Sequence, residues 1–241
     1  MIMFNQDTIN FLSDLRANNT RDWFEENRST YHDAVRDPAK AFAAALSELL
    51  EARGQGEVSP KIFRINRDLR FSKDKTPYNT HVHMAFRPAN AGPDGPAWMV
   101  GLEPGKLSLG AGIMGFTAGQ LETWRKSVAG PAGEMLQRDL DHLLKRGSSM
   151  SEPDLVRVPK PHAADHPRSH LLRRKGLVVW SHTDDPQMVL GPEGPARCTD
   201  RLKAFAPVMI WLNETMRAAP AVNYPNDATK AASITKRLKG N

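Results

Sequence analysis

The chain has 241 residues, of which 40% are hydrophobic and 25% are charged, which is typical of a globular protein and excludes a disordered or collagen-like chain. Its single cysteine, Cys198, excludes an internal disulfide and a cysteine-based zinc site. The 33 Lys and Arg residues exceed the 27 Asp and Glu residues and give a net charge of +6, which favours anionic partners.

The first third of the chain has the periodicity of helices. Asp7 suits the N-cap of a first helix, and Thr20 suits the N-cap of a second. A third helix is expected to begin near Pro38 and to end at Gly54. We therefore expect a helical segment over residues 1–56.

An antiparallel meander is predicted over residues 60–113. Residues 62–71 alternate between apolar and polar side chains, which predicts a strand with one polar face. Residues 80–86 alternate in the same way, and 98–102 and 107–111 are expected to form two more strands joined by a Pro-Gly turn. Short links between consecutive strands favour antiparallel pairing.

The region 117–217 is predicted to be mainly helical, with a fifth strand at 177–181. Asp165 suits the N-cap of a short helix. One long helix, bent at Pro207, is indicated by an apolar stripe with three- and four-residue spacing: Leu202, Phe205, Met209, Leu212 and Met216. Residues 220–241 form a polar tail. The fold class that we predict is a single α+β domain, with an antiparallel sheet of about four to five strands flanked by an N-terminal helical segment and C-terminal helices.

The positive charge is concentrated in two short segments. Residues 61–87 hold seven basic and two acidic side chains, and residues 157–175 hold six basic and one acidic. Such concentration attracts anions, although a solvated basic face is the alternative interpretation. The apolar run 41–46 is too short to cross a membrane, and the opening residues lack a secretory signal, so we expect a cytoplasmic protein with no membrane partner.

The run FRINRDLRFSKDKTPY at 63–78 is the most informative stretch. On the predicted strand Arg64, Asn66, Asp68 and Arg70 share one face, at a spacing of about 6.6–7 Å between successive residues. Two guanidiniums on either side of a carboxylate suit a bound phosphate or carboxylate, because each arginine offers a planar fork of donors.

Arg67 interrupts this pattern because it falls on the apolar face of the predicted strand. A buried arginine needs a charged partner, so we expect it to pair with Glu25, Glu26 or Asp22. A purely structural salt bridge is the alternative role for Arg67. The ordered loop that follows is expected to add Lys73, Lys75 and Tyr78 to a pocket at the end of the strand.

The same run resembles the signature of a microbial family of conserved hypothetical proteins, domain-of-unknown-function family 2461. The family's opening motif resembles Phe11-Leu12, Leu15, Asn18-Asn19, Trp23-Phe24, Asn27-Arg28 and Tyr31. Its third block resembles Pro159-Lys160, Asp165-His166-Pro167, Leu171-Leu172 and Lys175. The resemblance spans roughly residues 4–180, and it implies a microbial cytosolic protein with an α+β fold and no particular substrate.

Two pairs of histidines have spacings that let both imidazoles meet one metal ion. His81 and His83 are two residues apart on a predicted strand, and His166 and His170 are four apart on a predicted helix. The alternative is that the first pair donates hydrogen bonds from the basic sheet face and that His166 lies beside Asp165 at a helix start. We predict neither a metal nor a cofactor, and place His81, His83 and His166 at a ligand site.

Three functions are compatible with these patterns, and the sequence leaves open whether the protein is an enzyme. The one that we favour is that it binds or acts on a small anionic molecule. The site residues expected for this function are Arg64, Arg67, Asp68, Arg70, Lys73, Lys75, Tyr78, His81, His83 and His166. In the second, a structural or interaction protein uses the Arg/Asp motif as an internal salt-bridge network. The third is nucleic-acid binding through both basic segments, although the motif's aromatic residues are expected to face inward.

Overall fold

The computed structural model describes residues 3–70 and 72–217. Its centre is a sheet whose five strands pair in chain order, each antiparallel to the next. The strands are β1 (Val58–Ile62), β2 (Val82–Pro88), β3 (Ala97–Glu103), β4 (Lys106–Ile113) and β5 (Leu177–Thr183). Helices precede and follow the meander, which confirms the predicted α+β class.

The N-terminal segment is helical, as the periodicity predicts. Its elements are α1 (Gln6–Ala17), α2 (Arg21–Glu26), α3 (Arg28–Tyr31), the π-helical turn η1 (His32–Arg36), α4 (Asp37–Leu50) and a second π-helical turn, η2 (Glu51–Gln55). The predicted cap at Thr20 is confirmed, because its side chain accepts a hydrogen bond from the Trp23 amide. Asn5, rather than Asp7, caps α1, because its side chain accepts from the amides of Asp7 and Thr8.

The remaining helices follow the meander or lie between its last two strands. They are α5 (Ala118–Ala129), α6 (Pro131–Lys145), α7 (Ser169–Leu172), α8 (Gly194–Leu202) and α9 (Ala206–Arg217), with short turns η3 (Ala89–Ala91), η4 (Pro186–Val189) and η5 (Lys203–Phe205). The long bent helix is therefore wrong: η5 separates α8 from α9, and Pro207 lies in the first turn of α9, where its missing N–H is tolerated. Arg168, not Asp165, occupies the N-cap position of α7.

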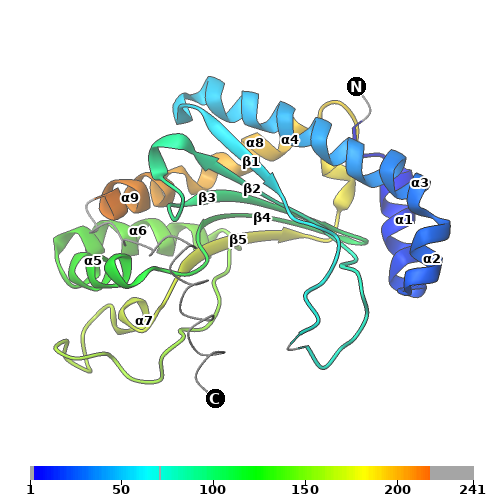
Figure 1. Cartoon of the computed structure of the whole chain (residues 1–241). Coiled ribbons are helices and arrows are strands. Elements are labelled where there is room, and N and C mark those ends of the chain that lie inside the picture. The colour runs from blue at the N-terminus through cyan, green and yellow to red at the C-terminus, as the bar shows by residue number, and fades with distance from the viewer. Residues whose placement is uncertain (1–2, 71, 218–241) are drawn as a thin grey trace, which may run out of the picture.

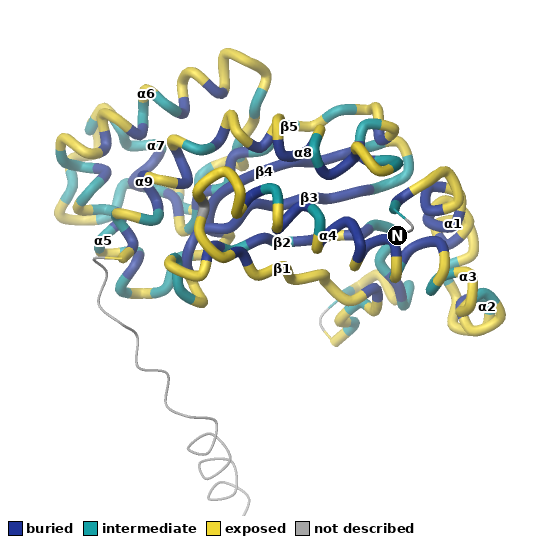
Figure 2. Tube along the Cα trace, turned by 90° about the horizontal axis from the view of Figure 1, so that it is seen from above, coloured by how far each residue is buried: buried dark blue, intermediate teal, exposed yellow. Residues whose placement is uncertain are grey.

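One face of the sheet is covered by α4, α8 and α9 (Figure 1). Alternate strand residues point toward these helices and are buried, among them Met84, Phe86, Trp98, Leu109 and Val179. Figure 2 shows the same contrast along the sheet, where the central strands are buried and the edge strand β1 is mostly exposed. Full burial of one such side chain contributes roughly 1.5–3 kcal/mol, so this layer is the main hydrophobic core.

The opposite face of the sheet lies between two long loops that extend from its two ends (Figure 1). One loop, 63–81, connects β1 to β2, and the other, 146–176, includes α7 and leads into β5. We call this side of the sheet the open face. Among the described helices, none is both long and apolar enough to span a membrane.

The predicted strand over 62–71 is wrong. Strand β1 ends at Ile62, and the chain then forms the loop 63–81, closed by an isolated bridge between Asn66 and Tyr78. The physical reason is that β2 begins only at Val82, so residues beyond 63 have no neighbouring strand to pair with and fold back on themselves. Phe71 lies outside the described residues, as does the predicted tail 220–241.

Asn19 connects this loop to the N-terminal helices, because its side chain makes the two backbone hydrogen bonds that a neighbouring strand would make. Its side-chain amide donates to the carbonyl of Tyr78 at 2.9 Å and accepts from the amide of Tyr78 at 3.1 Å. The buried Tyr78 ring stacks on Phe24, with ring centroids 4.1 Å apart. The loop is therefore held at its base by a two-bond clamp and an aromatic contact.

Candidate functional site

The open face is hollowed because small residues meet there from several strands. The antiparallel register places Gly101 opposite Ser108, Met99 opposite Gly110, and Ala97 opposite Gly112. With few side chains to fill the space, the sheet backbone itself forms the floor of a cavity of about 450 Å³, which we call the sheet hollow. A volume of this size is within the range of small-molecule sites.

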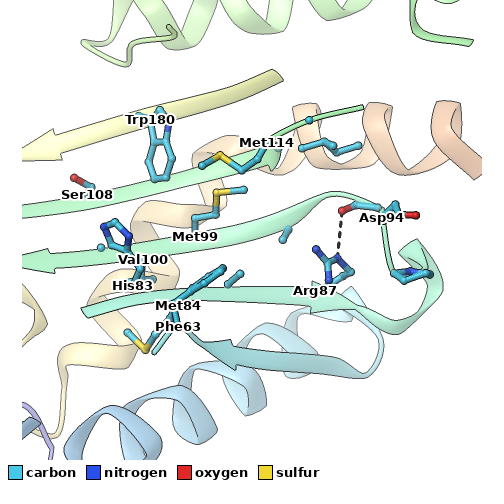
Figure 3. Close-up of a pocket in the computed structure, with 18 of the residues that line it drawn as sticks. Phe63, His83, Met84, Arg87, Asp94, Met99, Val100, Ser108, Met114 and Trp180 are labelled. Carbon is cyan, nitrogen blue, oxygen red and sulfur yellow. Dashed lines mark hydrogen bonds between the residues drawn. The ribbon is translucent and has the colours of Figure 1, made fainter. Parts of the chain in front are cut away.

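Two aromatic rings lie over glycines on this floor. A Cβ atom on Gly110 would come within 2.4 Å of Trp180 Cε3, so only glycine lets the indole rest there. A Cβ on Gly101 would come within 3.0 Å of His83 Cδ2. Figure 3 shows both rings on the lining of the sheet hollow. The glycines therefore position the rings as well as creating the space.

The walls of the sheet hollow are mainly apolar (Figure 3). Phe63 and Met114 are large apolar side chains that are 49% and 74% exposed, and Met99 from β3 lines the hollow with them. Arg87 also lines the hollow, but its guanidinium donates to the Gly95 carbonyl at 3.3 Å. The hollow is suited to the apolar part of a small molecule.

A polar row crosses the same face at the level of His83. Ser108 Oγ lies 2.9 Å from His182 Nδ1 on the neighbouring strand, and both residues line the sheet hollow. His83 stacks on His81, with ring centroids 3.8 Å apart. Partial burial, reinforced by the positive charge that His81 would carry, lowers the pKa of His83 to about 4. His83 is therefore uncharged at neutral pH.

A second cavity, of about 440 Å³, adjoins the first, and the two share Phe63 and His83. We call it the polar hollow, and its lining is Phe63, Arg64, Asn66, Arg67, Asp68, Asn79, His81 and His83. Arg64 is exposed, and no carboxylate of the described residues forms an ion pair with it. Of the ten site residues that the sequence predicts, five meet here: Arg64, Arg67, Asp68, His81 and His83.

Arg67 does not pair with Glu25, Glu26 or Asp22, and that prediction is wrong. Its Nη1 lies 2.6 Å from Asp74 Oδ2 and also donates to the carbonyl and the hydroxyl of Thr76, and Nη2 donates to Ser72. The loop folds back on itself, so the partner comes from within the motif. This network and the amide of Thr76 lower the pKa of Asp74 to about 2.

The other predicted site residues of the loop do not line the polar hollow. Arg70 forms an exposed ion pair with Asp68 at 2.6 Å, and this hydrogen bonding lowers the pKa of Asp68. Lys75 donates to the Leu69 carbonyl, and Lys73 is exposed. Tyr78 is buried against Phe24, and Lys75 lines a separate cavity with Asn19 and Thr20.

The second basic segment holds its own loop together and attaches it to the end of α5. Arg168 donates to the carbonyls that end α5, at Val128, Ala129 and Gly130, and Arg174 donates to the Ser151 carbonyl. His166 Nδ1 accepts from the Arg168 amide at 3.0 Å, so His166 belongs to the start of α7 rather than to either hollow. Within residues 3–70 and 72–217, no group of three or more His, Cys, Asp or Glu side chains is arranged to hold a metal ion.

The sheet hollow contains residues that the sequence reasoning did not select: Met99, Ser108, Met114, Trp180 and His182. The signal for three of them was present in the strand alternation. Ser108 alternates with buried leucines in β4, and Trp180 and His182 are on the same side of β5, opposite buried Val179. Alternation of this kind indicates that the sheet has a second face, but it does not show what covers that face.

The comparisons with known proteins agree with the motifs. No curated protein matches the chain. Residues 7–211 match the family described as "Conserved hypothetical protein (DUF2461)", and this confirms the family that the central run resembles. The match includes the helical N-terminus, all five strands and both loops beside the open face. The chain therefore belongs to the DUF2461 family.

Proposed function

We propose that this protein binds a small molecule that carries a carboxylate or phosphate group and a flat apolar part. The apolar part lies in the sheet hollow, and the anionic group lies in the polar hollow against Arg64. The observation that carries the proposal is that the two cavities adjoin at Phe63 and His83, which line both. We infer that one ligand of modest size spans the two.

The sheet hollow supports the apolar half of this proposal. Trp180, Phe63 and Met99 offer apolar surface around a floor with few side chains. Aromatic stacking adds about 0.5–1.5 kcal/mol to the effect of burying the same area, so a flat ring is favoured over a branched chain. The exposed Phe63 and Met114 would lose contact with water when such a ring binds.

Arg64 supports the anionic half. The other arginines of the motif are engaged by carboxylates of the loop, Arg67 by Asp74 and Arg70 by Asp68. The internal salt-bridge network that the sequence offers as an alternative therefore describes those two residues, whereas Arg64 keeps its guanidinium exposed beside the polar hollow. A guanidinium binds a carboxylate or phosphate through paired hydrogen bonds.

The test separates the two halves with three probes in isothermal titration calorimetry: 1-naphthyl phosphate, 1-naphthol and inorganic phosphate. We expect 1-naphthyl phosphate to bind at least tenfold more tightly than either of the others, because only it occupies both hollows. The Arg64→Gln variant should bind 1-naphthyl phosphate no better than 1-naphthol. Arg70→Gln is the matched control, since it removes a guanidinium of the same loop that is paired with Asp68.

A variant that fills the sheet hollow completes the test. Ala85 lines the hollow from β2, and Ala85→Phe should weaken both naphthyl probes while leaving the weak binding of phosphate unchanged. The proposal is rejected if 1-naphthyl phosphate does not bind, or if Arg64→Gln and Ala85→Phe bind it as tightly as the natural sequence. Circular dichroism and thermal unfolding establish that each variant is folded.

A further inference from the structure

A hydroxyl and an imidazole face each other on the floor of the sheet hollow. Ser108 on β4 and His182 on β5 are directly opposite in the antiparallel register, and Ser108 Oγ lies 2.9 Å from His182 Nδ1. Both side chains line the sheet hollow. A hydroxyl within hydrogen-bond distance of a neutral imidazole is the arrangement of a nucleophile and its general base.

The surroundings keep His182 ready to accept a proton. Partial burial and the nearby Lys106 lower the pKa of His182, and the carboxylate of Glu103 opposes this shift. The imidazole is therefore mainly uncharged at neutral pH. When it carries its own proton on Nε2, Nδ1 is free to accept the proton of Ser108.

Across Gly101 from Ser108, His83 provides a hydrogen-bond donor when its proton is on Nε2. The point at which a Cβ of Gly101 would sit is 3.1 Å from His83 Nε2 and 3.6 Å from Ser108 Cβ. The absent side chain thus leaves a gap bordered by both residues. A carbonyl oxygen in this gap would meet a donor on one side while its carbon faces the serine hydroxyl.

We propose that Ser108 and His182 form a nucleophile–base pair that hydrolyses esters of small apolar or aromatic acids. This inference rests on the proposed function in one respect, because it needs the apolar part of the ester to occupy the sheet hollow. His83 donates a hydrogen bond to the carbonyl oxygen. Water is the co-reactant, and no other reagent is required.

In the first half of the reaction, Ser108 Oγ forms a bond to the carbonyl carbon and its proton moves to His182 Nδ1. The carbonyl π electrons move to oxygen, where His83 stabilises the negative charge. When the C=O bond re-forms, the bond from carbon to the leaving alkoxide breaks, and the alkoxide takes the proton from His182. The products are an acylated Ser108 and a free alcohol.

In the second half, water attacks the acyl carbon and gives its proton to His182. The tetrahedral intermediate collapses, the bond to Ser108 Oγ breaks, and the serine oxygen recovers a proton from His182. The sum is one ester and one water converted to one acid and one alcohol. Both Ser108 and His182 return to their starting protonation states.

The experiment measures p-nitrophenyl butyrate hydrolysis and covalent labelling by an alkyl fluorophosphonate, read by intact and peptide mass spectrometry. We expect one adduct, on Ser108, and hydrolysis that falls by about 100-fold or more in Ser108→Ala and His182→Gln, since general-base catalysis contributes at least that much. The rate should rise with pH and reach a plateau once His182 is deprotonated. Ser59→Ala is the matched control, because Ser59 lies on β1 opposite Arg87, away from His182.

The outcomes distinguish this inference from the proposed function. If 1-naphthyl phosphate binds but Ser108 is not labelled and the Ser108→Ala variant hydrolyses the ester as fast as the natural sequence, the nucleophile–base pair is refuted and the binding proposal stands. If Ser108 is labelled and hydrolysis depends on His182 while 1-naphthyl phosphate does not bind, the pair is supported and the binding proposal is rejected. Labelling at a different serine also refutes the inference.

Discussion

The Gly110→Ala substitution gives the most direct test of how the sheet hollow is built. The new methyl group would lie 2.4 Å from Trp180 Cε3 and 2.8 Å from Cζ3, whereas carbon atoms in contact are normally about 3.5–4.0 Å apart. The indole must therefore move by more than about 1 Å. Because Trp180 lines the sheet hollow, the ring has space to move into it.

The expected cost follows from overpacking, which destabilises proteins by about 1–3 kcal/mol. For a protein of this length each kcal/mol lowers Tm by about 2–4 °C, so we expect a fall of roughly 2–12 °C in calorimetry. The displaced indole should also change tryptophan fluorescence and weaken binding of 1-naphthyl phosphate. Gly115→Ala is the control for the fall in Tm, because a Cβ there meets no atom within 4 Å and its backbone is not left-handed.

A double-mutant cycle decides whether the indole is the cause. In a Trp180→Ala background the clash is absent, so adding Gly110→Ala should be neutral or stabilise by up to about 1 kcal/mol. If Gly110→Ala costs the same with and without Trp180, the ring does not rest on this glycine. The account of the floor of the sheet hollow would then be wrong.

Three further predictions concern His83 and the loop 63–81. The pKa of His83 is about 4 in the folded protein and 6.5 in the unfolded chain, so the unfolded state is protonated first as pH falls. The free energy of unfolding should therefore decrease between about pH 6.5 and pH 4. Denaturant unfolding should show a decrease of about 1 kcal/mol after allowance for solvent screening, and the His83→Asn variant should show a smaller decrease. Asn19→Ala removes both bonds to the Tyr78 backbone and should cost about 1–3 kcal/mol while speeding proteolysis within the loop 63–81; equal proteolysis rates would contradict the clamp. Arg67→Lys should cost more stability than Arg70→Lys in the same urea titration, because Arg67 has several partners in the loop and a side chain 24% exposed, whereas Arg70 is 77% exposed and its pair contributes about 0–1 kcal/mol.

Four of the five strands follow from their sequence, because in β2, β3, β4 and the first half of β5 every second side chain is apolar and buried. The stretch 62–71 has the same alternation for a different reason. Ile65 is buried at 8% exposure, whereas Phe63 is 49% exposed at the rim of the sheet hollow. Apolar residues at the spacing of a strand therefore also occur in this loop, and the sequence pattern alone does not distinguish a loop from a strand.

The candidate site was only partly predictable from the sequence. Arg64, His81 and His83 belong to the basic run and could be selected by residue type. The sheet hollow could not be predicted, because it depends on side chains that are missing: Gly101 and Gly112 line it, and Gly110 leaves room for the Trp180 ring. The partner of Arg67, Asp74, was missed because an extended strand over 62–71 keeps the two residues apart, whereas the loop folds back and brings them together.

A cavity whose base is main chain has an unusual evolutionary restriction. Mutation of Gly101 can only make it shallower, since no residue is smaller than glycine, and a side chain at Gly101 or Gly110 also displaces His83 or Trp180. Homologues that accept ligands of different size should therefore retain both glycines and vary the side chains that border the entrance, such as Phe63 and Met114. In such proteins ligand selectivity would change through the side chains at the cavity entrance, whereas the residues of the cavity floor would stay the same.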